Sequence, residues 1–162
     1  MSNLAHVAPR WMSLFVLAVA MVTAARSAAL PAGVARTLVV GGYALALAGL
    51  AANLRLPWLW PALAGAALNM VVIAANGGRM PVSPGVLREA AGRVILGGTT
   101  GPFYVLTGPR TALPFLGDLL PLAAGGVGVI LSPGDALLVL GIAGIVQAGM
   151  MRPHGGEEGG PV

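Results

Sequence analysis

The chain has 162 residues, of which 57% are hydrophobic and only 9% are charged, and its mean hydropathy is +0.87. Soluble domains carry roughly a quarter charged residues, so this composition excludes an ordinary water-soluble protein and indicates a membrane protein. All nine basic residues are arginines, scattered singly between apolar runs, which argues against nucleic-acid binding. Because the chain contains no cysteine, disulfides, thiolate metal sites and a cysteine nucleophile are excluded.

Four apolar segments have the length and composition of membrane-spanning helices. Such a helix needs about 20 mainly apolar residues, and we expect spans at about residues 11–30, 36–54, 57–75 and 135–151. Trp58 and Trp60 open the third span, as is typical of a membrane interface. Arg10 gives the first segment the outline of a secretory signal, but further apolar segments follow, so we expect it to remain as the first span.

Glycine and alanine recur at helical spacing in the second, third and fourth spans. The motifs include Gly41-Gly42 with Gly49, Gly65-Ala66-Ala67, and Gly141 with Gly144. Small residues at this spacing let helix backbones approach closely in lipid. We expect them to serve packing within one bundle, with a homo-oligomer or a partner membrane subunit as the alternative.

Residues 76–134 are more polar and richer in glycine and proline than the spans. Ser83 and Pro84 predict a helix start, and apolar residues then recur at helical spacing from Val86 to Val94, which indicates an amphipathic helix lying at the membrane interface. Residues 96–111 are expected to form a loop. Residues 113–131 are apolar but broken by glycine and proline, which favours a re-entrant or protein-buried segment over a lipid-exposed span.

The sequence therefore predicts an all-α fold, a polytopic membrane helix bundle formed by one domain over residues 1–152. It should hold four transmembrane helices, one interfacial amphipathic helix and one broken or re-entrant segment, followed by a disordered tail over residues 153–162. The expected partner is the lipid bilayer of a cell membrane. The arginine distribution leaves the orientation open, because the long folded loop counts for less in the positive-inside rule.

Asp118 and Asp135 are the only acidic residues inside the apolar part of the chain, in the similar contexts Leu-Gly-Asp and Pro-Gly-Asp. An ionisable residue inside a membrane is a functional candidate, because burying its charge is costly. Two close carboxylates would give one acid and one base, the arrangement of an aspartyl hydrolase. The alternative is that each aspartate caps the start of a helix.

A binding site is predicted around the end of the third span. Asn76, Gly77 and Gly78 are expected either to terminate the helix or to form a nest of N–H groups for an anion or lipid headgroup, aided by Arg79. Asn69 lies seven residues before Asn76 on the same helix face, where its amide needs a partner across the bundle. No metal site and no cofactor are predicted.

Three motifs carry a resemblance to a known family: Asn-Gly-Gly-Arg-Met-Pro-Val-Ser from residue 76, Leu-Pro-Phe-Leu-Gly-Asp-Leu-Leu-Pro from residue 113, and Ser-Pro-Gly-Asp from residue 132. Over roughly the last 90 residues the chain resembles a bacterial membrane-protein family known only as domain of unknown function 5317. The resemblance implies a multi-pass protein of the bacterial inner membrane and no particular activity.

A more distant similarity is to lipoprotein signal peptidases, four-span enzymes with an Asn-x-Gly motif and two catalytic aspartates. Asn76, Asp118 and Asp135 fall in a similar order here, but the family's asparagine before the second aspartate is replaced by Ser132. We expect a noncatalytic bundle that binds a lipid, a small ligand or a partner subunit. The alternative is an intramembrane aspartyl hydrolase using Asp118 and Asp135.

Overall fold

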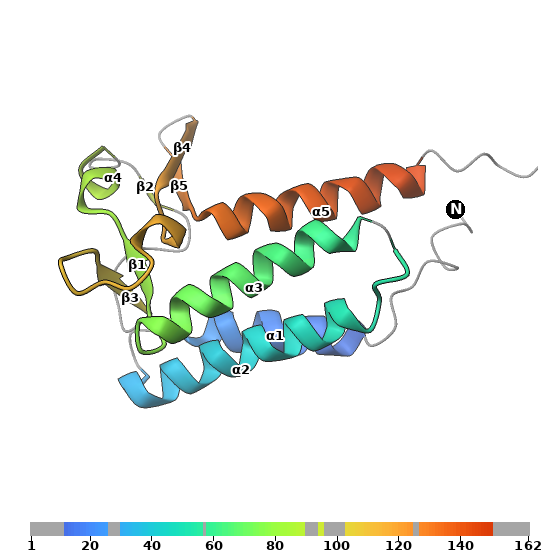
Figure 1. Ribbon diagram of the computed structural model, residues 1–162, viewed down its shortest axis with the longest axis horizontal. Helices are drawn as coiled ribbons and strands as arrows, with labels where there is room; N and C mark the ends of the chain where they lie inside the picture. Colours follow the sequence, from blue (N-terminus) through green and yellow to red (C-terminus); the bar gives the residue numbers. More distant parts are fainter. Residues whose placement is uncertain are drawn as a thin grey trace, which may run out of the picture.

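Four long helices lie side by side along the long axis of the molecule in the computed structural model (Figure 1). The structure describes residues 12–25, 30–56, 58–89, 94–95, 103–124 and 127–150. The helices are α1 (Met12–Ala25), α2 (Ala32–Ala51), α3 (Leu59–Ala75), α4 (Pro84–Glu89) and α5 (Pro133–Met150), with a short 3-10 turn η2 (Pro114–Leu116). The tail predicted over residues 153–162 lies outside the described residues.

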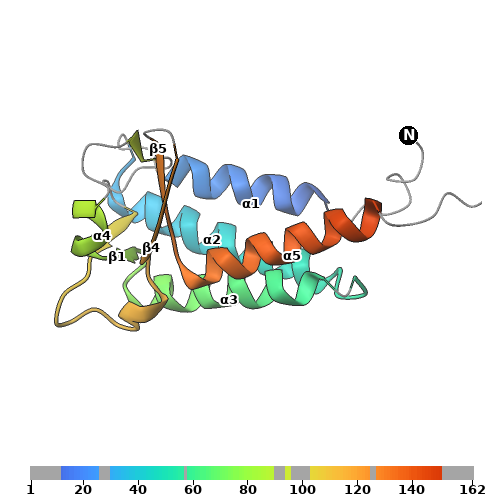
Figure 2. The same ribbon diagram turned by 90° about the horizontal axis from the view of Figure 1, so that it is seen from above.

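Each long helix coincides in position with a predicted span to within a few residues at the ends that the structure describes. Among the described residues, only one of these helices has the length and hydropathy of a span, so the prediction of four transmembrane helices is not supported. The long helices alternate in direction, so α4 and the strands gather at one end of the bundle while the α2–α3 turn lies at the other (Figures 1 and 2). That turn is short, and the buried Asn53 stabilises it by donating its side-chain N–H to the carbonyl oxygen of Gly49 at 2.7 Å.

Small residues set the packing distances between these helices. α1 packs on α2, α2 on α3 and α3 on α5. A Cβ added to Gly42 would lie 2.8 Å from a methyl group of Val22 on α1, and one added to Gly141 would lie 2.6 Å from the backbone nitrogen of Ala62 on α3. The small-residue stripes therefore serve contacts within this chain, as the sequence predicted.

The buried core divides into one cluster at each end of the bundle. The first joins α1, α2 and α3 to the strand end and contains Ala25, Ala35, Val39, Val72, Ile73, Met80 and Phe103. The second surrounds the α2–α3 turn and contains Leu50, Leu59, Ala62 and Ala66. Because Met80 and Phe103 belong to the first cluster, the segment after α3 is anchored directly on the bundle.

Residues between α3 and α5 form a cap of short strands, which we call the β cap. β1 (Met80–Val82) pairs in parallel with β3 (Tyr104–Leu106), with Pro81 opposite Val105. β5 (Val127–Leu131) is the middle strand of a second sheet, antiparallel to β4 (Leu120–Ala124) and parallel to β2 (Val94–Ile95). Val82 also bridges to Asp118, which connects the two sheets.

The β cap corrects the prediction of an all-α fold: the described chain is mostly helical, but residues 113–131 contain a β-hairpin where a re-entrant segment was expected. Proline and glycine weaken a helix, whereas the β-branched Val129 and Ile130 favour an extended chain. The pairing of β4 with β5 provides hydrogen bonds for backbone N–H and C=O groups that would have no partner in an irregular apolar segment.

The predicted amphipathic helix is shorter than its apolar pattern suggested. Among the described residues α4 covers Pro84–Glu89, and the backbone N–H of Leu87 donates to the Ser83 carbonyl oxygen at 3.1 Å. Val94, expected on the same helix, lies in β2 instead. Part of the predicted loop over residues 96–111 is likewise a strand, because β3 pairs with β1.

One described helix, Ala32–Ala51, is long and apolar enough to cross a membrane, with a mean hydropathy of 1.6 over an 18-residue window of its 20 residues. Three shorter apolar helices accompany it: Ser13–Ala25, Leu59–Ala75 and Pro133–Ala148. Large apolar side chains are exposed along the outside of these helices, among them Val16, Val19, Val71, Val139, Ile142 and Val146.

Candidate functional site

The start of α5 is fixed by a reciprocal pair of hydrogen bonds between Ser132 and Asp135. The backbone N–H of Asp135 donates to the Ser132 hydroxyl oxygen at 3.0 Å, and the backbone N–H of Ser132 donates to Asp135 Oδ2 at 3.0 Å. With Pro133 at the first helical position, this is a capping box, which satisfies two of the unpaired N–H groups of the helix terminus. The predicted capping role of Asp135 is therefore present in the structure.

Asn69 on α3 joins this cap to the neighbouring helix. Its side-chain N–H donates to Asp135 Oδ1 at 2.7 Å, and its Oδ1 accepts the Ser132 hydroxyl proton at 2.9 Å. Asn69 and Ser132 are both fully buried, so each polar atom in this cluster needs the partner it has. We call Asn69, Ser132 and Asp135 the polar clamp; it confirms that Asn69 makes a hydrogen bond across the bundle.

Glycines allow the polar clamp to form. A Cβ on Gly134 would collide with the Asn69 side chain, and a Cβ on Gly65 would collide with the carbonyl oxygen of Gly134 and lie 2.9 Å from the backbone nitrogen of Leu138. The backbones of α3 and α5 therefore approach to a distance that only glycine permits at these two positions.

Asn76 ends α3 and fastens a distant loop to it. The side-chain N–H groups of Asn76 donate to the carbonyl oxygens of Val72 at 2.7 Å and Ala112 at 2.8 Å, and its Oδ1 accepts the backbone N–H of Ala112 at 3.0 Å. The amide thus pairs with both backbone groups of Ala112 as a neighbouring strand would. Its three hydrogen bonds hold residues 108–112 beside the end of α3.

Gly77 and Gly78 form a helix-terminating turn. Their φ angles are +66° and +79°, and their N–H groups donate to the carbonyl oxygens of Ala74 at 3.2 Å and Ile73 at 2.9 Å. This is the Schellman pattern of a helix C-terminus. The two N–H groups that an anion nest would use are therefore already hydrogen-bonded to carbonyl oxygens of α3. Of the residues predicted for this binding motif, Arg79 is the one whose side chain can donate to an anion.

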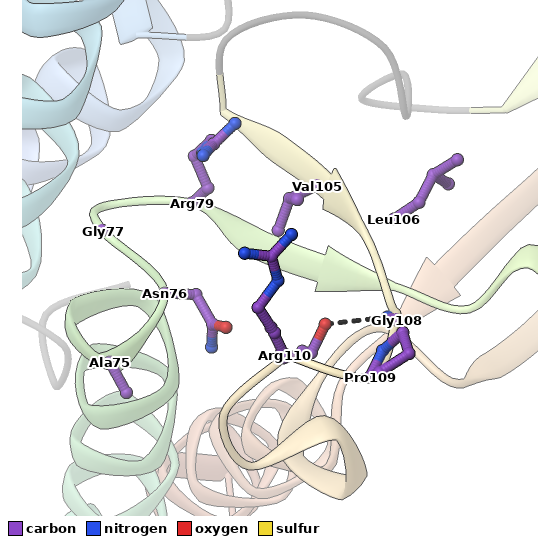
Figure 3. A pocket seen from close by; sticks show the side chains of 10 residues that line it. Ala75, Asn76, Gly77, Arg79, Val105, Leu106, Gly108, Pro109 and Arg110 are labelled. Atoms are coloured by element: carbon purple, nitrogen blue, oxygen red, sulfur yellow. Dashed lines mark hydrogen bonds between the residues drawn. The ribbon is translucent and has the colours of Figure 1, made fainter.

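A pocket of about 480 Å³ opens between the end of α3, the start of β1 and the loop after β3 (Figure 3). Its walls combine polar and apolar side chains: Ala75, Asn76, Gly77, Arg79, Val105, Leu106, Gly108, Pro109, Arg110 and Thr111. The loop is held in a tight turn, since Gly108 N–H donates to Thr111 Oγ1 at 2.8 Å and Thr111 N–H donates to the Gly108 carbonyl oxygen at 3.0 Å. Arg79 and Arg110 thus face one cavity from two different elements.

Arg79 is only half-exposed, and its Nε is buried without a hydrogen-bond partner among the described residues. Arg36 at the start of α2 is in the same situation, and its side chain packs against Gly78, 2.9 Å from where a Cβ would stand. A buried guanidinium N–H without an acceptor is unfavourable by roughly 1–3 kcal/mol. This end of the bundle therefore holds two guanidinium groups that are incompletely satisfied, and Arg79 is the one that also lines the pocket.

Asp118 lies at the junction of the two sheets. Its backbone N–H donates to the Pro81 carbonyl oxygen at 2.8 Å, and its carbonyl oxygen accepts the N–H of Ser83 at 3.3 Å. The residue is only 6% exposed. It starts no helix, so the predicted capping role is wrong for Asp118, and its backbone instead holds the β cap together.

The β4–β5 hairpin brings Asp118 and Asp135 to the same end of the bundle, since Leu119 N–H donates to the Leu131 carbonyl oxygen at 3.1 Å. The two oxygens of Asp135 accept hydrogen bonds from Asn69 and Ser132. Both hydrogen bonds hold Asp135 within the polar clamp, so the structure gives this carboxylate a structural role at the junction of α3 and α5. Within the described part of the chain, no three carboxylate or imidazole side chains converge as metal ligands.

Sequence reasoning missed three residues of this region. Ser132 was noted only as a replacement, although Ser-x-x-Asp before an apolar run is the pattern of a capping box. Arg110 carried no local signal, because its position depends on the pairing of Asn76 with Ala112. Arg36 was expected at the start of a span on the same side of the membrane as Arg79 and Arg110, but its contact with Gly78 was not expected.

The comparisons with known proteins identify a family without an activity. No curated protein and no solved structure is significantly similar to this chain. A family model described as a family of unknown function (DUF5317) matches residues 4–147, which extends well beyond the last 90 residues that carry the three motifs. The chain belongs to this family.

Proposed function

We propose that this protein is a noncatalytic, multi-span protein of the cell membrane that binds an anionic ligand in the pocket beside Arg79 and Arg110. The observation that carries the proposal is that Arg79 and Arg110, which come from two different elements, line one cavity of about 480 Å³. Arginine presents several fixed N–H donors and suits phosphate or carboxylate groups.

The membrane part of the proposal has three supports. The composition is that of a membrane protein, α2 has the length and hydropathy of a span, and α1, α3 and α5 present exposed apolar side chains of the same kind. In water such a surface would favour aggregation. Four antiparallel helices crossing the bilayer would place the β cap at one membrane face and the α2–α3 turn at the other.

Charge distribution supports an orientation with the β cap in the cytoplasm. Among the described residues, Arg36, Arg79, Arg88 and Arg110 lie at the β-cap end of the bundle, whereas Arg55 lies at the opposite end. Arginine close to the end of a span is enriched on the cytoplasmic side of membrane proteins, and Arg36, Arg79 and Arg88 lie within or near α2 and α3 in this way. The pocket would then open toward the inner surface of the membrane.

An intramembrane aspartyl hydrolase, the alternative function, is not favoured. Such an enzyme needs two carboxylates that share a proton. The hydrogen bonds of Asp135 join α5 to α3, so we propose that its role is to stabilise the fold.

The anion site is tested by ligand-induced stabilisation of the detergent-purified full chain. The panel consists of inorganic phosphate, glycerol 3-phosphate and a short-chain phosphatidylglycerol. A ligand at one hundred times its Kd adds about 2.7 kcal/mol to the free energy of unfolding, so we expect at least one of the three to raise Tm by several degrees.

The variant carrying Arg79→Gln and Arg110→Gln should lose this shift, while Arg55→Gln and Arg88→Gln together should keep it. The control pair removes the same charge from side chains that do not line the pocket. Equal shifts in both double variants, or no shift with any ligand in the wild type, would overturn the proposed site.

A further inference from the structure

An exposed apolar stripe on α3 leads directly to the pocket. Ala64, Leu68, Val71 and Ala75 follow one another at intervals of three or four residues and so lie on one face of the helix. Leu68 is half-buried and the other three are exposed, Val71 at 52%. Ala75, the last residue of this stripe, also lines the pocket.

The length of the α3 stripe fits one membrane leaflet. Eleven residues separate Ala64 from Ala75, which corresponds to about 16 Å along a helix. The hydrocarbon core of a bilayer is roughly 30 Å thick, so one leaflet accounts for about half of that. A single acyl chain lying along the stripe would therefore end near the middle of the membrane.

The pocket has one polar wall and one apolar wall, as a site for an amphipathic ligand would. Arg79, Arg110 and Asn76 supply its polar wall, while Val105 and Leu106 supply an apolar wall. Leu106 is 58% exposed although it is a large apolar residue. A small hydrophilic anion would leave this apolar wall uncovered, whereas a lipid would cover it.

We infer that the ligand of this pocket is an anionic phospholipid, with its phosphate on Arg79 and Arg110 and one acyl chain along the α3 stripe. The inference rests on the proposed anion site and names its ligand. Residues 76–132 contain Arg79, Arg88, Arg93 and Arg110 against Glu89 and Asp118, so the region has a surplus of two positive charges. That surplus favours a headgroup with net negative charge over a zwitterionic one.

The experiment compares an anionic phospholipid with ligands that have either its acyl chains or its net negative charge, but not both. Dissociation constants are measured by calorimetry in detergent for dioctanoyl phosphatidylglycerol, dioctanoyl phosphatidylcholine, glycerol 3-phosphate and inorganic phosphate. Burying each methylene of an acyl chain contributes favourably to the free energy of binding. Phosphatidylglycerol should therefore bind at least about tenfold more tightly than glycerol 3-phosphate or inorganic phosphate. Loss of a charge-assisted hydrogen bond in Arg79→Gln should weaken phosphatidylglycerol binding by about tenfold.

A pair of valine variants tests the α3 stripe separately from the anion site. Val71→Asn should weaken phosphatidylglycerol binding and leave inorganic phosphate binding unchanged. Val139→Asn on α5 is the matched control, because Val139 is 59% exposed and lies outside the stripe. Circular dichroism and gel filtration show whether each variant keeps the wild-type fold.

The outcomes separate the two proposals. If inorganic phosphate binds as tightly as phosphatidylglycerol and depends on Arg79, the anion site stands and the lipid ligand is wrong. If phosphatidylcholine binds as tightly as phosphatidylglycerol, or Val71→Asn and Val139→Asn behave alike, the lipid inference is also overturned. If no anionic ligand binds, or Arg79→Gln binds like the wild type, both proposals fail.

Discussion

Replacing Asn69 by alanine should destabilise the protein by uncoupling α3 from α5. The substitution removes the hydrogen bonds to Asp135 Oδ1 at 2.7 Å and from the Ser132 hydroxyl at 2.9 Å. It leaves the buried Ser132 hydroxyl and the half-buried Asp135 carboxylate without these partners. Interhelical hydrogen bonds in membrane bundles contribute on average about 0.6 kcal/mol each and at most about 1.7. Two such bonds correspond to about 1–3 kcal/mol.

The free energy of unfolding is measured in mixed micelles by titration with a denaturing detergent. Thr37→Ala is the control, because Thr37 is exposed and donates one local hydrogen bond to the Gly33 carbonyl oxygen at 3.1 Å; its change should stay within about 0.5 kcal/mol. The double variant of Asn69→Ala with Ser132→Ala should show a coupling energy of about 0.5–2 kcal/mol. Additive effects of the two substitutions, or an effect of Asn69→Ala no larger than that of Thr37→Ala, would refute the role of the polar clamp.

Three further substitutions test the packing and the pocket walls. Gly65→Ala should lower the free energy of unfolding by about 1–3 kcal/mol, because the added Cβ would collide with the α5 backbone. Gly33→Ala is the control and should leave the free energy of unfolding unchanged, because no atom lies within 4 Å of its added Cβ. Equal free energies of unfolding for the two variants would contradict the close packing of α3 on α5. Gly77→Ala should lower the free energy of unfolding by about 1–2 kcal/mol, because alanine disfavours the φ of +66° at this position. Gly77→Asn should lower it less, because asparagine tolerates the left-handed region better. Equal losses in the two variants would argue against a left-handed turn. Asn76→Asp cannot donate to the Ala112 carbonyl, so limited proteolysis at residues 107–112 should accelerate and anion binding should weaken; an unchanged digestion rate would contradict the anchoring role.

The helical part of the fold could be read from the sequence because apolar runs of nearly 20 residues leave few alternatives. The polar clamp was partly foreseen: Asn69 was expected to bond across the bundle and Asp135 to stand at a helix start. The pairing of Asn69 with Asp135 was not foreseen, since the two are 66 residues apart with the β cap between them and no local pattern connects them.

The β cap could not be predicted because β1, β2 and β3 are only two or three residues long and pair with partners distant in sequence. β1 pairs with β3 across more than twenty residues, and β2 pairs with β5 across more than thirty. Strands this short give almost no periodic signal. The pocket depends on the same long-range contacts, which is why Arg79 was identified next to its glycine motif and Arg110 was not.

The most direct test of the account is the position of the two ends of the bundle relative to the membrane. Because the chain has no cysteine, single cysteines at Ala52, in the α2–α3 turn, and at Pro109, in the pocket loop, can be labelled in intact cells with an impermeant maleimide. We predict labelling of Ala52→Cys in intact cells and labelling of Pro109→Cys only after the membrane is permeabilised. Labelling of both positions from the same side would contradict a bundle that crosses the membrane with its anion pocket at one face, and the reverse pattern would contradict the cytoplasmic placement of that pocket.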